Sequence, residues 1–75
     1  MAAGAAEELR SPIQGTVVRV SVAEGQAVRR GDLVCVVEAM KMDNEVTAHR
    51  DGVVRELAVT VGDGVKVGTR VATIA

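Results

Sequence analysis

Residues 33–42 read Leu-Val-Cys-Val-Val-Glu-Ala-Met-Lys-Met, and their pattern changes sharply part-way along. The first five residues form an apolar run that is short enough to be a buried strand rather than a helix. The alternating sequence of residues 44–48 predicts another strand. The connection between these two strands requires a tight reversal, which places Met40 and Lys41 at the tip of a β-hairpin.

This predicted tip has an unusual composition. Two-residue hairpin tips favour Asn-Gly or Asp-Gly, because both central residues adopt positive φ angles. The pair Met40-Lys41 contains neither glycine nor asparagine. Departures from such local rules are typical of functional sites. Lys41 is therefore the leading candidate for a functional residue.

The sequences on the two sides of this hairpin repeat each other with an offset of 37 residues (52 minus 15). Glycines match at three places and apolar residues at seven. The glycine pairs are Gly15/Gly52, Gly25/Gly62 and Gly31/Gly68, and the apolar pairs are Leu9/Val46, Val17/Val54, Val20/Leu57, Val22/Val59, Val28/Val65, Val34/Val71 and Val37/Ile74. Matching glycines indicate that the same tight turns occur in both halves.

The repeat also predicts an irregularity in one strand of each half. Apolar residues occupy positions 17, 20 and 22 in the first half and the matching positions in the second, whereas Val18 aligns with Arg55. A step of three residues followed by a step of two changes the face to which side chains point. We therefore expect β-bulges near residues 18–19 and 55–56.

Two β units of this kind cannot bury their apolar faces separately, so they should pack as an antiparallel two-sheet sandwich with an approximate two-fold axis. Residues 7–11 predict a short edge strand that ends before Pro12. Val28 is a lone apolar residue between two turns. The predicted domain covers residues 7–75, and residues 1–6 are expected to be a flexible tail or the end of a linker.

Composition excludes several classes of protein. The chain of 75 residues has one cysteine and one histidine, so it can form neither an internal disulfide nor a zinc cluster. A net charge of −1 and the lack of aromatic residues argue against nucleic-acid binding. No apolar run approaches the roughly 20 residues that span a bilayer, and residues 1–6 lack the basic region and apolar core that we expect of a secretory signal. We expect a cytoplasmic protein with no membrane partner and no bound metal.

The choice of lysine at the tip is informative. Only two of the nine basic residues are lysines, and Lys66 aligns with Arg29 in the repeat. A solvated turn charge accounts for Lys66. At Lys41, an amine that can lose a proton and attack an acyl group differs chemically from a guanidinium group. From the residues alone, Lys41 is either an exposed charge or an amine for covalent modification.

The segment Glu38-Ala39-Met40-Lys41-Met42 resembles the biotin attachment motif of the biotin carboxyl carrier domains of biotin-dependent carboxylases. The resemblance extends from about Leu9 to Ala75. It includes Ser11-Pro12-Ile13-Gln14-Gly15, the Gly-x-x-Val-x-x-Gly segments at 25–31 and 62–68, and Ala48 followed by Asp51-Gly52-Val53-Val54.

The resemblance implies a barrel-sandwich hybrid of two four-stranded sheets, with biotin attached to Lys41 by a biotin protein ligase. Glu38, Ala39, Met40 and Met42 would be recognised by that ligase. The biotin arm would carry a carboxyl group from a biotin carboxylase to a carboxyltransferase of the acyl-CoA or pyruvate class. The domain itself would be a monomeric carrier without catalysis of its own.

Two alternatives differ in the fate of the lysine. Lipoyl domains are similar but usually have Asp before the lysine and Ala after it, and unmodified structural modules generally lack the lysine motif. Gly15 to Gly25 and Gly52 to Gly62 both span ten positions, so the first half has no inserted thumb relative to the second. The chain is thus similar to the thumbless carriers.

The remaining candidates have simple structural interpretations. Cys35 lies in the apolar run and is expected to be a small buried residue rather than a nucleophile. His49 is expected at the surface beside a turn. Glu38, Asp43 and Glu45 place acidic groups around the predicted tip, either as solvated charges or as a docking surface for a ligase or carboxylase.

Overall fold

The computed structural model describes residues 6–75, which form eight β-strands and no helix. The strands are β1 (Glu7–Arg10), β2 (Gly15–Val20), β3 (Ala27–Val28), β4 (Leu33–Ala39), β5 (Met42–Thr47), β6 (Gly52–Leu57), β7 (Gly64–Val65) and β8 (Arg70–Ile74). Ala6 is exposed and lies outside the strands. Residues 1–5 of the predicted tail lie outside the described residues.

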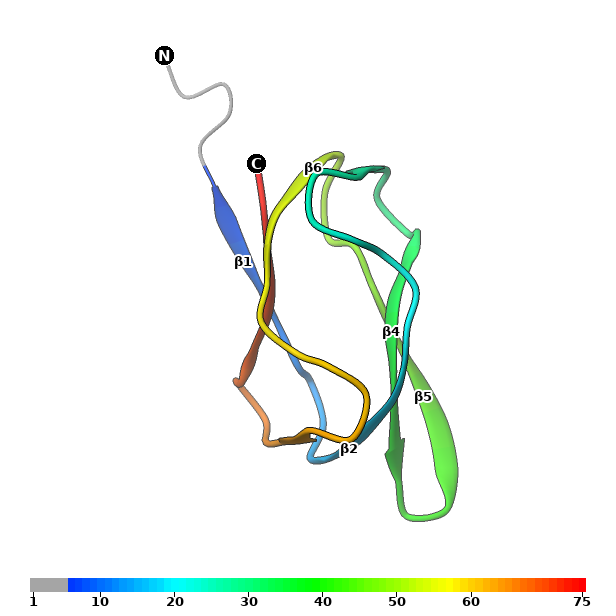
Figure 1. Cartoon of the computed structure of the whole chain (residues 1–75). Helices are drawn as coiled ribbons and strands as arrows, with labels where there is room; N and C mark the ends of the chain where they lie inside the picture. Colours follow the sequence, from blue (N-terminus) through cyan, green and yellow to red (C-terminus); the bar gives the residue numbers. More distant parts are fainter. Residues whose placement is uncertain (1–5) are drawn as a thin grey trace.

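The strands form two four-stranded antiparallel sheets with the orders β1-β8-β6-β3 and β5-β4-β2-β7 (Figure 1). The predicted fold class, a flattened sandwich of two four-stranded sheets, is confirmed. Strands β4 and β5 form a hairpin that extends beyond the rest of the second sheet. The two-residue strands β3 and β7 were not predicted, since each contains a single buried side chain, Val28 or Val65.

The sequence repeat corresponds to a structural two-fold relation. The offset of 37 residues maps β1 to β4 onto β5, β6, β7 and β8 in order, and so maps one sheet onto the other. Equivalent hydrogen bonds join the halves: Gly25 N donates to Val54 O at 2.7 Å, and Gly62 N donates to Val17 O at 2.7 Å. Each half therefore adds its short strand to the sheet of the other half.

The predicted bulges are present at equivalent places. Pairing of β2 with β4 changes register between Val17 and Arg19, and pairing of β6 with β8 changes register between Val54 and Glu56. Val17 is fully buried, whereas Val18 is 40% exposed. Strand alternation accounts for this difference, and the bulge explains why Val20, three residues after Val17, again packs against the core.

The core consists mainly of small branched side chains from both sheets. Its fully buried members include Val17, Val34, Cys35, Val37, Val54, Val71, Ala72 and Ile74. Cys35 confirms its prediction as a buried residue with a free thiol, and burial raises the pKa of this thiol. Branched side chains have few rotamers to lose and pack well on a pleated surface, so a core without aromatic residues is sufficient here.

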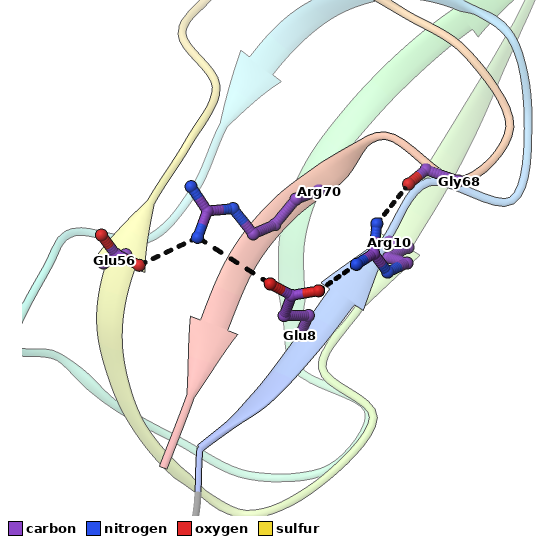
Figure 2. A network of polar contacts seen from close by, with 5 residues as sticks. All are labelled: Glu8, Arg10, Glu56, Gly68 and Arg70. Atoms are coloured by element: carbon purple, nitrogen blue, oxygen red, sulfur yellow. Dashed lines mark hydrogen bonds and ion pairs between the residues drawn. The ribbon is translucent and has the colours of Figure 1, made fainter.

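A network of charged side chains connects three strands of the sheet β1-β8-β6-β3 (Figure 2). Arg70 lies between two carboxylates, with Nη1 at 3.0 Å from Glu56 Oε1 and at 3.9 Å from Glu8 Oε2. Glu8 also pairs with Arg10, whose Nη1 donates to Gly68 O at 2.8 Å. These side chains are partly exposed, so each pair contributes little stability. The network links the edge strand β1 to β8 and β6.

Candidate functional site

The hairpin between β4 and β5 has a tip of two residues, as predicted. Ala39 pairs with Met42, which leaves Met40 and Lys41 as the central residues. Their φ angles are 52° and 64°, so both are left-handed, as a type I′ turn requires. A left-handed conformation costs a residue with a side chain roughly 1–2 kcal/mol. This tip is the only place among residues 6–75 where residues other than glycine have positive φ.

The turn exposes the side chains that flank the lysine. Met40 is 93% exposed and Met42 is 67% exposed, while Ala39 is buried at the base of the tip. Lys41 is exposed as well. Within residues 6–75, no hydrogen bond or ion pair involves the Lys41 side chain. Its amine is therefore available to an approaching molecule.

The base of the hairpin is held by short-range contacts. The Asn44 side chain donates to Val37 O at 3.3 Å and to Met42 O at 3.2 Å, and so bridges β4 and β5. On the other side, β2 approaches so closely that a Cβ atom on Gly15 would lie 2.2 Å from Glu38 O. Sequence reasoning missed the role of Asn44; its one signal is an amide residue of low β propensity inside a strand.

Acidic groups surround the base of the tip, as the sequence indicated. Glu38 and Asp43 are directly opposite each other in the register, and Glu45 follows two residues along β5. All three side chains are exposed. Like charges at paired positions are unfavourable for the sheet itself. The arrangement gives the surface below Lys41 a negative potential.

A shallow recess lies beside the hairpin, between it and the segment that precedes β2. Its lining residues are Ile13, Gln14, Gly15, Glu38, Ala39 and Met40. The recess is mainly apolar, and Ile13, Ala39 and Met40 are its larger apolar lining residues. It connects the hairpin to the neighbouring end of the sandwich.

The other candidate residues do not join this site. Cys35 lies in the core, and His49 is at the far end of the hairpin strands, where its Nε2 is 3.3 Å from Glu7 Oε1. No group of three metal-ligating side chains occurs among residues 6–75. The same residues contain no helix that is long and apolar enough to cross a membrane.

Comparison with known proteins identifies the family. The family described as "Biotin-requiring enzyme" matches residues 7–74, which is most of the chain. The chain belongs to this family. As a biotinyl domain, it is 55% identical over 73 residues to the biotin-dependent acyl-coenzyme A carboxylase alpha3 subunit of Mycobacterium leprae (strain TN). That match covers 97% of this chain and 12% of the relative.

Two further relatives differ strongly in length. The biotinyl domain is 50% identical over 60 residues to the mitochondrial propionyl-CoA carboxylase alpha chain of Homo sapiens, covering 80% of this chain and 8% of that protein. It is 38% identical over 69 residues to the biotinylated protein TB7.3 homolog of Mycobacterium leprae (strain TN), covering 92% of this chain and 97% of that protein. The domain thus matches a small part of long carboxylase chains and nearly all of one short protein.

Among solved structures, the biotinyl domain superposes on part of the Kluyveromyces lactis urea carboxylase with a TM-score of 0.87 and 37% sequence identity. This match covers 93% of the domain and 6% of that chain. The chain is therefore a biotinyl domain of the biotin-dependent carboxylase type, with covalently attached biotin as its cofactor, and this is consistent with a carboxyl carrier role. The lipoyl and structural alternatives are not favoured.

Proposed function

We propose that Lys41 is the residue to which biotin is attached. The observation that carries this proposal is an exposed amine, without a partner among residues 6–75, at a hairpin tip whose two central residues are both left-handed. The tip holds this amine away from the two sheets. The other lysine, Lys66, is exposed in a turn where the equivalent residue is Arg29, so its position calls only for a positive charge.

Attachment requires an activated biotin, which we assign to a biotin protein ligase. In this step Lys41 Nζ loses a proton and attacks the acyl carbon of biotinyl-adenylate. An amide C–N bond forms, the acyl C–O bond to phosphate breaks, and adenosine monophosphate leaves. Glu38, Ala39, Met40 and Met42 support recognition, since the two methionines present exposed side chains on either side of the lysine.

The attached biotin supplies the site at which a carboxyl group is held during transfer. The domain's own residues provide position: the hairpin carries the amine beyond the sheets, and Asn44 and Gly15 fix the base of the hairpin. No nucleophile, base and orienting group lie together around the tip within residues 6–75. We therefore assign catalysis to a biotin carboxylase and a carboxyltransferase, and no catalytic residue to this chain.

We further propose an acyl-CoA as the carboxylated substrate, because the relatives with 55% and 50% identity are named as acyl-coenzyme A and propionyl-CoA carboxylase subunits. We take the biotinyl domain to be residues 7–75, which form all eight strands and the closing pair between Val53 and Ala75. Pyruvate carboxylation is the second candidate class.

Coexpression with a biotin protein ligase, followed by intact mass measurement and a streptavidin blot, tests the attachment site. We expect one biotin on the wild-type chain, one on Lys66→Arg and none on Lys41→Arg. Lys66→Arg is a matched control because it removes the other lysine and keeps the charge. Modification of Lys41→Arg, or an unmodified wild-type chain, contradicts the proposal.

A further inference from the structure

The approximate two-fold relation provides two equivalent ends of the molecule for comparison. The lysine end contains the turns at residues 60–63 and 66–69, because β7 pairs with the start of β2 beside Glu38 (Figure 1). The opposite end contains the equivalent turns at 23–26 and 29–32, and Glu7 pairs with Ile74 there.

The backbone is nearly the same at both ends. Asp32 N donates to Arg29 O at 2.9 Å, and the equivalent Thr69 N donates to Lys66 O at 3.0 Å. The two other turns also match, with N–O distances of 3.1 Å from residue 26 to 23 and from residue 63 to 60. The turn geometry therefore does not depend on the side chains that differ between the ends.

Those side chains differ consistently in polarity. The lysine end has Val61 and Val67 where the opposite end has Glu24 and Arg30. The segment before β2 likewise has Pro12, Ile13 and Gln14 where the segment before β6 has His49, Arg50 and Asp51. Charged residues satisfy the same fold at the opposite end. The exposed Val61 and Val67 are thus not required by the turns that contain them, whereas Ile13 is half-buried and also packs against the core.

We define an apolar band as Met40, Ile13, Pro12, Val67 and Val61, where Val61 lies in the turn that the hydrogen bond from Gly62 N to Val17 O holds beside β2. Val67 is 72% exposed and Val61 is 64% exposed. The hydrogen bond from Gly68 N to Ser11 O, 2.8 Å long, places Val67 next to the segment that contains Pro12 and Ile13. Ile13 and Met40 line the same recess. The band therefore extends from the turn at 66–69 to the tip that carries Lys41.

We propose that this apolar band is a docking surface for the biotin protein ligase, an inference that rests on Lys41 being the acceptor. The ligase must bring an acyl carbon into contact with Lys41 Nζ. An interface of about 800 Å² per partner has a radius of about 16 Å, so it covers far more than a two-residue tip. Three strand spacings, about 14 Å, separate β5 from β7. Across the sheet, the turns beside β7 therefore lie at a distance from the hairpin that is comparable to this radius.

One further consideration favours the ligase over the other enzymes. A carboxylase or carboxyltransferase acts at the distal end of the biotin arm, so its active site lies further from the domain. The ligase acts directly at the lysine and must fit the surface around it. Because Glu38 and Asp43 are exposed below the tip, the complementary surface has an apolar patch flanked by basic side chains.

The test exchanges residues between the two ends. The double variant Val61→Glu with Val67→Arg places the side chains of the opposite end on the lysine end, and Arg30→Val makes the reverse exchange far from Lys41. We expect kcat/KM for biotinylation by purified ligase to fall about tenfold in the double variant, mainly through KM, because charges would be buried in an apolar interface. Arg30→Val should stay within about twofold of wild type.

Thermal unfolding followed by circular dichroism verifies that the variants fold, and Val67→Ser provides a neutral substitution that should lower kcat/KM in the same direction. Unchanged ligase kinetics in the double variant would overturn the docking proposal. The proposed attachment of biotin to Lys41 is tested separately, and it stands if the wild-type chain carries biotin on Lys41. If the wild-type chain sediments as a dimer and the double variant as a monomer, the band serves self-association, and this result also overturns the proposal of a ligase docking surface.

Discussion

The hairpin β4–β5 and the strand pair β8–β1 are equivalent under the two-fold relation, yet they end differently. Val37 pairs with Asn44 in the hairpin, and Ile74 pairs with Glu7 at the equivalent position. Beyond this point the hairpin adds two further pairs and a left-handed tip, whereas β8 and β1 stop. The sandwich is complete without the extension. The extension and its strained turn therefore lie outside the part of the structure that the two halves share.

Substituting the glycine at the base of each strand pair should affect the two pairs unequally. A Cβ on Gly15 would lie 2.2 Å from Glu38 O and 2.8 Å from Val37 Cγ1, both within β4. A Cβ on Gly52 would lie 2.6 Å from Ala75 O, beyond the end of β8. We expect Gly15→Ala to lower the free energy of unfolding by about 3 kcal/mol and Gly52→Ala by about 1 kcal/mol.

Urea unfolding followed by far-ultraviolet circular dichroism measures this difference, since the chain has no Trp or Tyr for fluorescence. Gly64→Ala is a suitable control because a Cβ added there would have no other atom within 4 Å and the φ of Gly64 is not positive. Equal losses at Gly15 and Gly52 would show that β2 does not hold the hairpin more tightly than β6 holds the equivalent pair.

Relieving the strained turn should make the hairpin more stable and less reactive. Met40 has a φ of 52°, and asparagine tolerates this conformation better than methionine. We expect Met40→Asn to raise the free energy of unfolding by about 1 kcal/mol and to lower the rate of biotinylation. Met42→Asn is the matched control, because it removes an exposed methionine at a residue without positive φ. An equal gain in stability from Met42→Asn would contradict this account.

The smallest effect is expected at Cys35, whose equivalent in the other half is the fully buried Ala72. Burial raises the pKa of the Cys35 thiol above its ordinary value of 9.0. The unfolded thiol therefore ionises at a lower pH than the folded one, so the wild-type chain should lose stability as pH rises past about 9. Cys35→Ala should cost less than about 1 kcal/mol at pH 7 and lack this alkaline loss.

Urea unfolding of both chains at pH 7, 8, 9 and 10 checks the pH dependence. The difference in unfolding free energy between wild type and Cys35→Ala should narrow at the two highest values. A constant difference from pH 7 to 10 would show that the thiol ionises equally in the folded and unfolded chains.

Much of this fold could be predicted because the two halves of the repeat are two sequences for the same structural unit. The matched glycines predicted the turns. The alignment of Val18 with Arg55, beside the shared apolar positions 17, 20 and 22, predicted the bulges. The tip at Met40-Lys41 followed from the lengths of its two strands. These features depend on local sequence or on the alternation of apolar residues, and both are visible in a single chain.

The remaining features depend on contacts between distant segments. Strands β3 and β7 have two residues each and exist because each pairs with the opposite half of the repeat. The bridging role of Asn44 depends on the direction of its side chain, which a strand pattern does not give. The apolar band joins residues 12–13, 40 and 61–67, and only the fold brings these segments to one end.

Glu7 and Ala75 both lie at the end of the sandwich opposite Lys41 (Figure 1). Glu7 pairs with Ile74 at the end of β8, and Ala75 is hydrogen-bonded to Val53 near the start of β6. A fusion partner or a solid support joined through Ala75 would therefore lie on the side of the domain that faces away from Lys41. A layer of such molecules on a sensor surface would have a common orientation, with every amine facing the solution. Enzymes added to that solution would meet the reactive end first.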